Sequence, residues 1–293
     1  MPGKVAARRA AKRPGRKALD TTKPFYDAEA ALAFFRSVGK PQTISKGTTI
    51  FSESSKGTPR LAPGRIYLLL QGEVSVLASG EPIATIESGE IFGEMATLGQ
   101  VPRSASAVAK TACRVIGLDE DQFQVALGKD PGFALMLLSI MAARLRDTLA
   151  RVGAPDDGWR EAAALDKQLL ADLGQVIGPA ARFRHEAGKI IMREGQRGVA
   201  LYAVLDGRVA IRIGDTVVEK VGPGGVFGEM SLVDRTPRLA TAVAETDCVL
   251  LAISRHMFLH LVKRSPKFGA AVLRAVGERA AFTASRSSAS KAA

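Results

Sequence analysis

At 293 residues the chain is long enough for two domains of about 100–150 residues, and its 46% hydrophobic and 24% charged content is that of a globular protein. The longest nearly uncharged apolar run, Gly132–Ala143, is about half of the ~20 residues that a membrane-spanning helix needs. The basic start, Met1–Pro24, lacks the apolar segment of a secretory signal. These features exclude membrane insertion and predict a cytoplasmic protein.

The formal net charge of +12 is concentrated at the N-terminus. Residues 1–24 hold eight Lys or Arg residues against Asp20 alone, so they contribute +7 and the remaining chain +5. This segment is rich in Ala, Pro and Gly and has too little apolar surface to fold alone, so we predict a basic disordered tail over residues 1–24. Residues 4–23 have the charge to contact nucleic acid, acidic lipid or an acidic protein, although a merely solvated tail has the same composition.

The first half of the chain predicts one helix, a series of short strands and then two more helices. A helix is expected over Phe25–Val38 with Asp27 as its N-cap. Apolar strands separated by glycine-containing turns are expected at Lys46–Phe51, Arg65–Leu70, Glu73–Leu77, Pro82–Ile86, Ser104–Lys110 and Cys113–Leu118. From Glu120 the apolar period becomes helical, with a break at Asp130-Pro131 and a second helix over Phe133–Leu149.

The second half repeats this order after a linker at Arg151–Trp159. A helix is expected over Arg160–Ile177. Strands are then expected at Lys189–Met192, Leu201–Leu205, Arg208–Ile213, Val217–Val221, Ala242–Ala244 and Cys248–Ile253. Helices from Phe258 and Phe268 close the chain, and Thr283–Ala293 is expected to be disordered.

The two halves arose by duplication. Between Gly89 and Cys113, 13 of 25 residues are identical to those 135 positions later, without a gap. Upstream the offset becomes 141, because the loop at Ser54–Gly64 is six residues longer in the first copy. Cys113 and Cys248 occupy matching positions, so each is expected to fill a core site in its own domain rather than to pair with the other, as suits a reducing compartment.

Short strands at this spacing are typical of a small barrel or jelly roll. We therefore predict a mainly β protein with flanking α-helices, built from two tandem small barrels or jelly rolls. The expected units are the tail at 1–24, one domain at 25–155, a second domain at 156–282 and a disordered tail at 283–293.

The best-repeated segments carry charge in fixed register. Phe92–Ser106, the first cassette, and Phe227–Thr241, the second cassette, both begin Phe-Gly-Glu-Met and place a Pro-Arg pair so that Arg follows Glu by nine residues. Glycine permits close backbone approach, Arg supplies a fork of donors for phosphate, and Glu supplies an acceptor for a sugar hydroxyl. Phosphate beside a sugar hydroxyl indicates a nucleotide with compact geometry.

On these residues the chain resembles the cyclic nucleotide-binding domain family, which includes regulatory subunits of cAMP-dependent kinase, cyclic-nucleotide-gated channels and catabolite-activator proteins. The family cassette reads approximately F-G-E-[LM]-A-L, a few variable residues, then P-R-x-A-T. The resemblance extends from Phe25 to about Phe282. It implies two tandem, eight-stranded, jelly-roll-like β-rolls, each with a short cassette helix and C-terminal helices, and a cyclic nucleotide ligand, cAMP or cGMP. We expect no catalytic residue, metal or other cofactor.

The resemblance also implies roles for the cassette residues. Glu94 and Glu229 would accept the ribose 2′-hydroxyl, and Arg103 and Arg238 would hold the cyclic phosphate. The implied ligand-binding residues are Gly93, Glu94, Met95, Ala96, Arg103, Ser104 and Ala105 in the first cassette, and Gly228, Glu229, Met230, Ser231, Arg238, Leu239 and Ala240 in the second.

Ligand preference is expected to depend on the residue after each Arg. In kinase relatives a Thr there favours cGMP through a hydroxyl bond to guanine. Leu239 offers no such bond and favours cAMP at the second site, whereas Ser104 is compatible with either nucleotide.

Other functions are less well supported. His256 and His260 stand four apart on a predicted helix but lack an evident third metal ligand, and neither copy pairs a nucleophile with a His. Only about 25 residues follow Phe268, too few for a helix-turn-helix module. We predict a non-enzymatic cyclic nucleotide receptor, for cAMP more than cGMP, whose helices shift on binding to regulate a protein partner. The alternative is a nucleic-acid-associated protein that uses residues 4–23.

Overall fold

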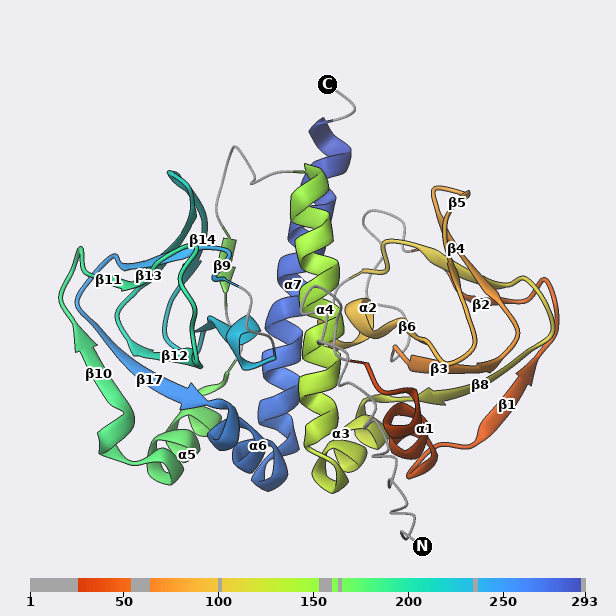
Figure 1. Ribbon diagram of the computed structural model, residues 1–293, viewed down its shortest axis with the longest axis horizontal. Coiled ribbons are helices and arrows are strands. Elements are labelled where there is room, and N and C mark those ends of the chain that lie inside the picture. Colours follow the sequence, from red (N-terminus) through yellow and green to blue (C-terminus); the bar gives the residue numbers. More distant parts are fainter. Residues whose placement is uncertain are drawn as a thin grey trace, which may run out of the picture.

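Two β-rolls lie on either side of a central pair of long helices (Figure 1). The computed structural model describes residues 26–53, 64–99, 102–152, 160–162, 165–233 and 237–290. The predicted tail at 1–24 and most of the predicted linker lie outside these residues, and the domain boundaries remain predictions.

The first roll has the predicted eight strands, in two antiparallel four-stranded sheets ordered β1-β8-β3-β6 and β2-β7-β4-β5. Its strands are β1 (Pro41–Ile44), β2 (Thr49–Phe51), β3 (Ile66–Gln71), β4 (Val74–Ala78), β5 (Glu81–Ile86), β6 (Ile91–Phe92), β7 (Ser106–Ala109) and β8 (Cys113–Leu118). Strand β6 leads directly into the short helix α2 (Glu94–Gly99) of the first cassette.

The second roll repeats this topology, with sheets ordered β10-β17-β12-β15 and β11-β16-β13-β14-β9. Its strands are β10 (Arg182–His185), β11 (Ile190–Met192), β12 (Ala200–Asp206), β13 (Val209–Ile213), β14 (Thr216–Val221), β15 (Val226–Phe227), β16 (Thr241–Ala244) and β17 (Cys248–Ser254). The 3₁₀ turn η2 (Glu229–Leu232) takes the place of α2 in the second cassette. The predicted fold class is therefore confirmed.

The start of the second half differs from the prediction. Arg160–Ala162 forms a strand, β9, that pairs in parallel with β14, and the helix α5 begins only at Lys167 and ends at Ile177. The predicted helix over Arg160–Ile177 is therefore wrong in its first part. The free edge of β14 offers backbone partners to this segment, and such pairing overrides a weak local helix preference.

The remaining helices frame the rolls. They are α1 (Ala28–Arg36), α3 (Glu120–Lys129), α4 (Gly132–Val152), α6 (Arg255–Arg264), α7 (Pro266–Ser290) and the 3₁₀ turn η1 (Pro179–Ala181). The predicted cap of α1 is confirmed, since the Asp27 carboxylate accepts hydrogen bonds from the N–H groups of Glu29 and Ala30, both at 3.0 Å. Helix α7 continues through Ser290, so most of the tail predicted to be disordered over 283–293 is helical.

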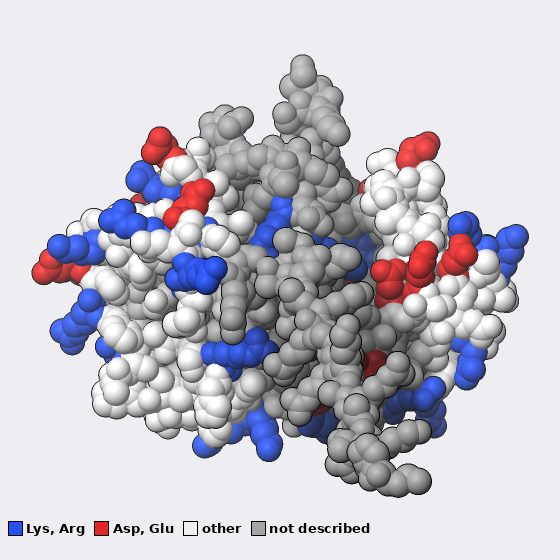
Figure 2. Space-filling view, viewed as in Figure 1, with Lys and Arg blue, Asp and Glu red and all other residues white. Residues whose placement is uncertain are grey.

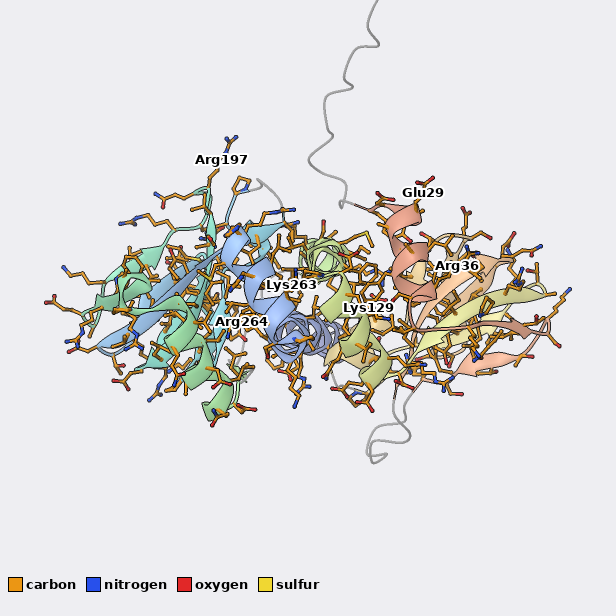
Figure 3. All side chains as sticks on the ribbon, turned by 90° about the horizontal axis from the view of Figure 1, so that it is seen from below. Glu29, Arg36, Lys129, Arg197, Lys263 and Arg264 are labelled. Atoms are coloured by element: carbon orange, nitrogen blue, oxygen red, sulfur yellow. The ribbon has the colours of Figure 1, made fainter. Side chains whose placement is uncertain are left out.

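Helices α4 and α7 pack against each other between the rolls, as both side and end views show (Figures 1 and 3). In the end view, the last turns of α3 and α6, marked by Lys129 and by Lys263 and Arg264, lie beside the pair. Helix α7 also packs against α2 of the first roll. There a Cβ added to Gly277 would lie 2.8 Å from the Cα of Gly99, so the two helices meet backbone to backbone.

The largest hydrophobic core contains buried residues from both halves of the chain. One apolar cluster combines the helices with the inward strands of both rolls, and a smaller cluster fills the interior of each roll. Cys113 lies in the interior cluster of the first roll and Cys248 in that of the second, and both are free thiols. The prediction that each fills an equivalent core position is confirmed.

The surface of the described chain mixes charges of both signs. On the face in Figure 2, Lys and Arg side chains are interspersed with Asp and Glu over both rolls. Among the helices that the structure describes, none is long and apolar enough to cross a membrane. Within the same residues no cluster of three or more His, Cys, Asp or Glu side chains is arranged to hold a metal ion.

Candidate functional site

Each cassette opens with a glycine in a left-handed backbone conformation. Gly93 has a φ of 79° and Gly228 a φ of 75°, which residues with a Cβ rarely adopt. The glycine turns the chain out of the short strand β6 or β15 and aims the next residue, Glu94 or Glu229, into the interior. The glycine therefore permits the turn that buries a carboxylate at the end of a short strand.

The two cassette glutamates are buried and only half satisfied. Glu94 is 0% exposed and Glu229 is 3% exposed. One oxygen of each accepts a hydrogen bond from an Arg of the last helix of the same copy: Arg144 Nη1 bonds Glu94 Oε1, and Arg279 Nη1 bonds Glu229 Oε1 at 2.6 Å. Among the described residues neither Oε2 atom has a hydrogen-bond partner. A buried acceptor without a donor is unfavourable, so each cassette holds a polar group that a ligand hydroxyl can satisfy.

The ion pair of the second copy is more extensive than that of the first. Arg279 also bonds Glu219 through its Nε at 2.7 Å and donates to the carbonyl of Val226. Burial acts to lower the pKa of Arg279, but the two carboxylates outweigh it and raise the pKa overall. The Arg144 side chain is 40% exposed against 13% for Arg279, and Ala84 stands where the second copy has Glu219. The second pair is therefore better shielded from solvent.

The sequence indicated that Arg144 and Arg279 match in the repeat but gave no site role to either. Each lies 50 residues after the glutamate that it binds. The available signal was an Arg at the same position of the last helix in each copy. Without the packing of those helices, that signal does not identify the partner.

The cassette arginines lie at the glycine turns that precede the glutamates. Arg238 donates to the carbonyl of Gly228 at 2.9 Å and to that of Ala200 at 3.1 Å. Arg103 donates to the carbonyl of Arg65 and to the hydroxyl of Thr97, both at 3.3 Å. Both guanidinium groups therefore converge on the glycine turns.

Burial lowers the pKa of both Arg103 and Arg238, and the neighbouring tyrosine and cassette glutamate partly oppose this effect. A guanidinium remains charged at neutral pH despite such a shift. The lowered pKa means that each guanidinium group is poorly solvated by water. An anion that reaches either group would replace this missing solvation.

An open pocket of about 120 Å³ lies in the second roll beside Arg238. Its walls include Glu229, Leu239, Phe282 of α7 and Leu145. Leu145 belongs to α4, so the first half of the chain contributes to the site of the second. Neither Leu145 nor Phe282 was identified from sequence, because their placement depends on how α4 and α7 pack.

The other predicted site residues lie around the same turns. Ser231 donates its hydroxyl to the carbonyls of Gly228 and Ala200, so it braces the turn of the second cassette. Ser104 is exposed, whereas Leu239 is half-buried against the pocket. The predicted residues that are partly or fully buried near the turns are Met95, Ala96, Ala105, Met230 and Ala240.

Comparison with known proteins agrees with this geometry. The profile of the family described as cyclic nucleotide-binding domain matches residues 41–130 and 182–265, one segment in each roll. The cAMP-dependent protein kinase regulatory subunit of Schizosaccharomyces pombe is 30% identical over 195 residues, which cover 65% of this chain and 42% of the relative. The protein of the same description from Colletotrichum orbiculare is 26% identical over 186 residues, covering 62% of this chain and 43% of the relative.

The chain thus spans less than half the length of these curated relatives. Among solved structures, the regulatory domain of Toxoplasma gondii PKA in complex with cAMP is 21% identical, with 80% of this chain and 85% of that one covered and a TM-score of 0.29. The two segments matched by the family profile make up more than half of the chain. The protein therefore belongs to the cyclic nucleotide-binding domain family and carries that domain twice.

Proposed function

We propose that the protein is a receptor for a cyclic nucleotide, cAMP in preference to cGMP, and that the pocket of the second roll is its principal binding site. One observation carries this proposal: Glu229, whose buried Oε2 has no hydrogen-bond partner among the described residues, and Arg238 both line one open pocket. A ligand that places a hydroxyl beside a phosphate satisfies both groups at once.

In the proposed complex, the ribose 2′-hydroxyl donates to Glu229 Oε2. The cyclic phosphate accepts from Arg238 and from backbone N–H groups of the second cassette. The base lies against the apolar side chains of Leu239, Phe282 and Leu145, which line the pocket. Leu239 has no hydroxyl to bond guanine, which favours adenine.

We propose regulation of a protein partner, rather than catalysis, as the output. The two fungal relatives are described as cAMP-dependent protein kinase regulatory subunits, which supports control of a partner by ligand binding. Arg279 connects the pocket to α7, so a ligand at Glu229 acts directly on that helix. Such a ligand shifts the helix position to the extent that it binds one arrangement better than the other.

The nucleic-acid alternative has no support in the described residues, since the basic segment at 4–23 lies outside them. We also propose a cytoplasmic location, in keeping with two free buried cysteines.

Titration calorimetry with cAMP, cGMP and linear AMP tests the proposed ligand. We expect cAMP to bind most tightly, and Arg238→Ala to weaken its binding about 10–150-fold, because a charge-assisted hydrogen bond contributes about 1.5–3 kcal/mol. Arg212→Ala is the matched control, since Arg212 is an exposed Arg on β13 of the same roll. If Arg238→Ala binds cAMP as tightly as the parent protein, the assignment is wrong.

A further inference from the structure

The two sites differ at one position of equivalent strands. Phe51 ends β2 and pairs with Ala107, whereas Met192 ends β11 and pairs with Ala242. Since Ala107 and Ala242 are themselves 135 residues apart in the ungapped repeat, Phe51 and Met192 occupy the same place in their rolls. The first site therefore has an aromatic ring where the second has a flexible thioether chain.

In the first roll this ring covers the cassette arginine. The Cζ atom of Arg103 lies 3.7 Å from the centroid of the Phe51 ring, a face-on cation–π contact. A Cβ built on Gly93 would lie 3.2 Å from both Cε1 of Phe51 and Nη1 of Arg103. The space over the glycine turn, where an anion would meet the backbone and the guanidinium, is therefore bordered closely by the Phe51 ring.

Neighbouring rings hold Phe51 in this place. Its centroid lies 6.2 Å from that of Tyr67 and 6.1 Å from that of Phe92, and the latter two are stacked at 5.2 Å. In the second roll the stacked pair is present as Tyr202 and Phe227, whose ring centroids are 5.3 Å apart, and Met192 takes the place of the third ring. Phe51 is thus a third ring added to a pair that both rolls share.

The second site is arranged differently around its arginine. Met192 lines the pocket beside Arg238. The Arg238 guanidinium lies 5.9 Å from the Tyr202 ring, and the three atoms nearest a Cβ built on Gly228 come from Arg238 and Ala200. Here the Arg238 guanidinium itself, 2.5 Å from that Cβ, borders the glycine turn, and no aromatic ring among the described residues covers it as Phe51 covers Arg103 in the first roll.

We propose that Phe51 keeps the first site closed to cyclic nucleotide, so that the two sites bind the same ligand with unequal affinity, the second more tightly. The proposal rests on the proposed function. A cyclic phosphate at Arg103 requires the Phe51 ring to leave both the guanidinium and the aromatic cluster, and the lost contacts weaken binding. Phe51 is accordingly a residue that sets affinity without bonding the ligand.

The test isolates the first site by calorimetry with cAMP in an Arg238→Ala background. We expect Phe51→Met to tighten the remaining binding about ten-fold, equivalent to about 1.4 kcal/mol. The reciprocal change, Met192→Phe in an Arg103→Ala background, should weaken the second site about as much. Phe183→Met is the matched control, since Phe183 is an exposed Phe on the edge strand β10.

The outcomes separate this inference from the proposed function. A parent protein that binds no cyclic nucleotide removes both. Two equal sites in the parent, or a folded Phe51→Met variant with unchanged first-site affinity, overturn the role of Phe51 and leave the receptor function standing. Thermal unfolding establishes whether each variant is folded; if Phe51→Met does not fold, Met192→Phe decides, and an unchanged second-site affinity there overturns the inference.

Discussion

The second oxygen of Glu229 is the most informative single atom of the site. Glu229 is 3% exposed. Its Oε1 accepts a hydrogen bond from Arg279, whereas its Oε2 has no partner among the described residues. A buried acceptor without a hydrogen bond costs about 1–3 kcal/mol relative to a satisfied one. Part of the affinity for a ligand with a suitably placed hydroxyl is therefore expected to come from satisfying this oxygen.

The affinity of the Glu229→Gln variant for cAMP tests whether this carboxylate accepts a hydrogen bond from the ligand. The amide keeps the shape of the side chain but turns an N–H group toward either Arg279 or the ligand hydroxyl, so cAMP should bind about ten-fold or more weakly. Calorimetry with cAMP and 2′-deoxy-cAMP on parent and variant completes a double-mutant cycle. The parent should prefer cAMP clearly, and the variant should lose most of that preference.

Glu186→Gln serves as the control for this cycle, since Glu186 is an exposed Glu in a turn of the same roll. An equal preference for cAMP over its deoxy analogue in parent and Glu229→Gln would show that Glu229 does not contact the 2′-hydroxyl.

The polar residues of both cassettes could be identified from the sequence, and their role in binding remains a prediction. The duplicated Gly, Glu and Arg residues were identified from spacing alone, and the structure brings them together at each glycine turn. The sequence did not predict Phe51, Leu145 or the roles of the helix arginines. These residues come from separate elements, and only packing places them at the site.

Among the elements, strands with a buried face were predicted best. β8 was predicted with the same bounds that the structure has, because five of its six residues are buried. β1 and β10 were missed, since each has three exposed residues out of four and pairs only at a sheet edge. Neither strand contains two consecutive apolar residues, so neither leaves an apolar run in the sequence.

The contact between helices α2 and α7 requires glycine at the point where their backbones meet. A Cβ on Gly277 would lie 2.8 Å from the Cα of Gly99 and 3.0 Å from the carbonyl of Met95. These neighbours are backbone atoms of another helix, so they cannot rotate aside as a side chain can. The closeness of α2 to α7 therefore depends on two glycines that face each other.

We expect Gly277→Ala to destabilise the protein by about 1–3 kcal/mol, because overpacking against backbone outweighs the gain of about 1 kcal/mol in helix propensity. Urea denaturation followed by circular dichroism measures the difference. Gly174→Ala on α5 is the control: a Cβ there meets only the end of the Arg182 side chain at 3.0 Å, so the propensity gain should prevail. A stabilised Gly277→Ala protein would contradict this packing.

For the whole molecule, each half supplies part of the surroundings of the other half's cassette. Leu145 of α4 lines the pocket of the second roll, and α7 packs on α2 of the first. Arg279, which binds Glu229, lies two residues from Gly277, which touches α2. A short physical path therefore leads from the second site to the first cassette, through the packing of α7 on α2.

This path predicts that ligand in the second site alone orders the first cassette. With first-site binding disabled by Arg103→Ala, saturating cAMP should slow amide hydrogen exchange in α2 as well as in η2, because α7 contacts α2 and holds Glu229 through Arg279. The outer strand β5, at the far edge of the first roll, is the internal control and should be unaffected. Protection confined to the second roll would mean that the two sites act independently. Protection that reaches α2 would make the helix pair α4 and α7 the connection between them, with a coupling free energy expected at about 1–3 kcal/mol.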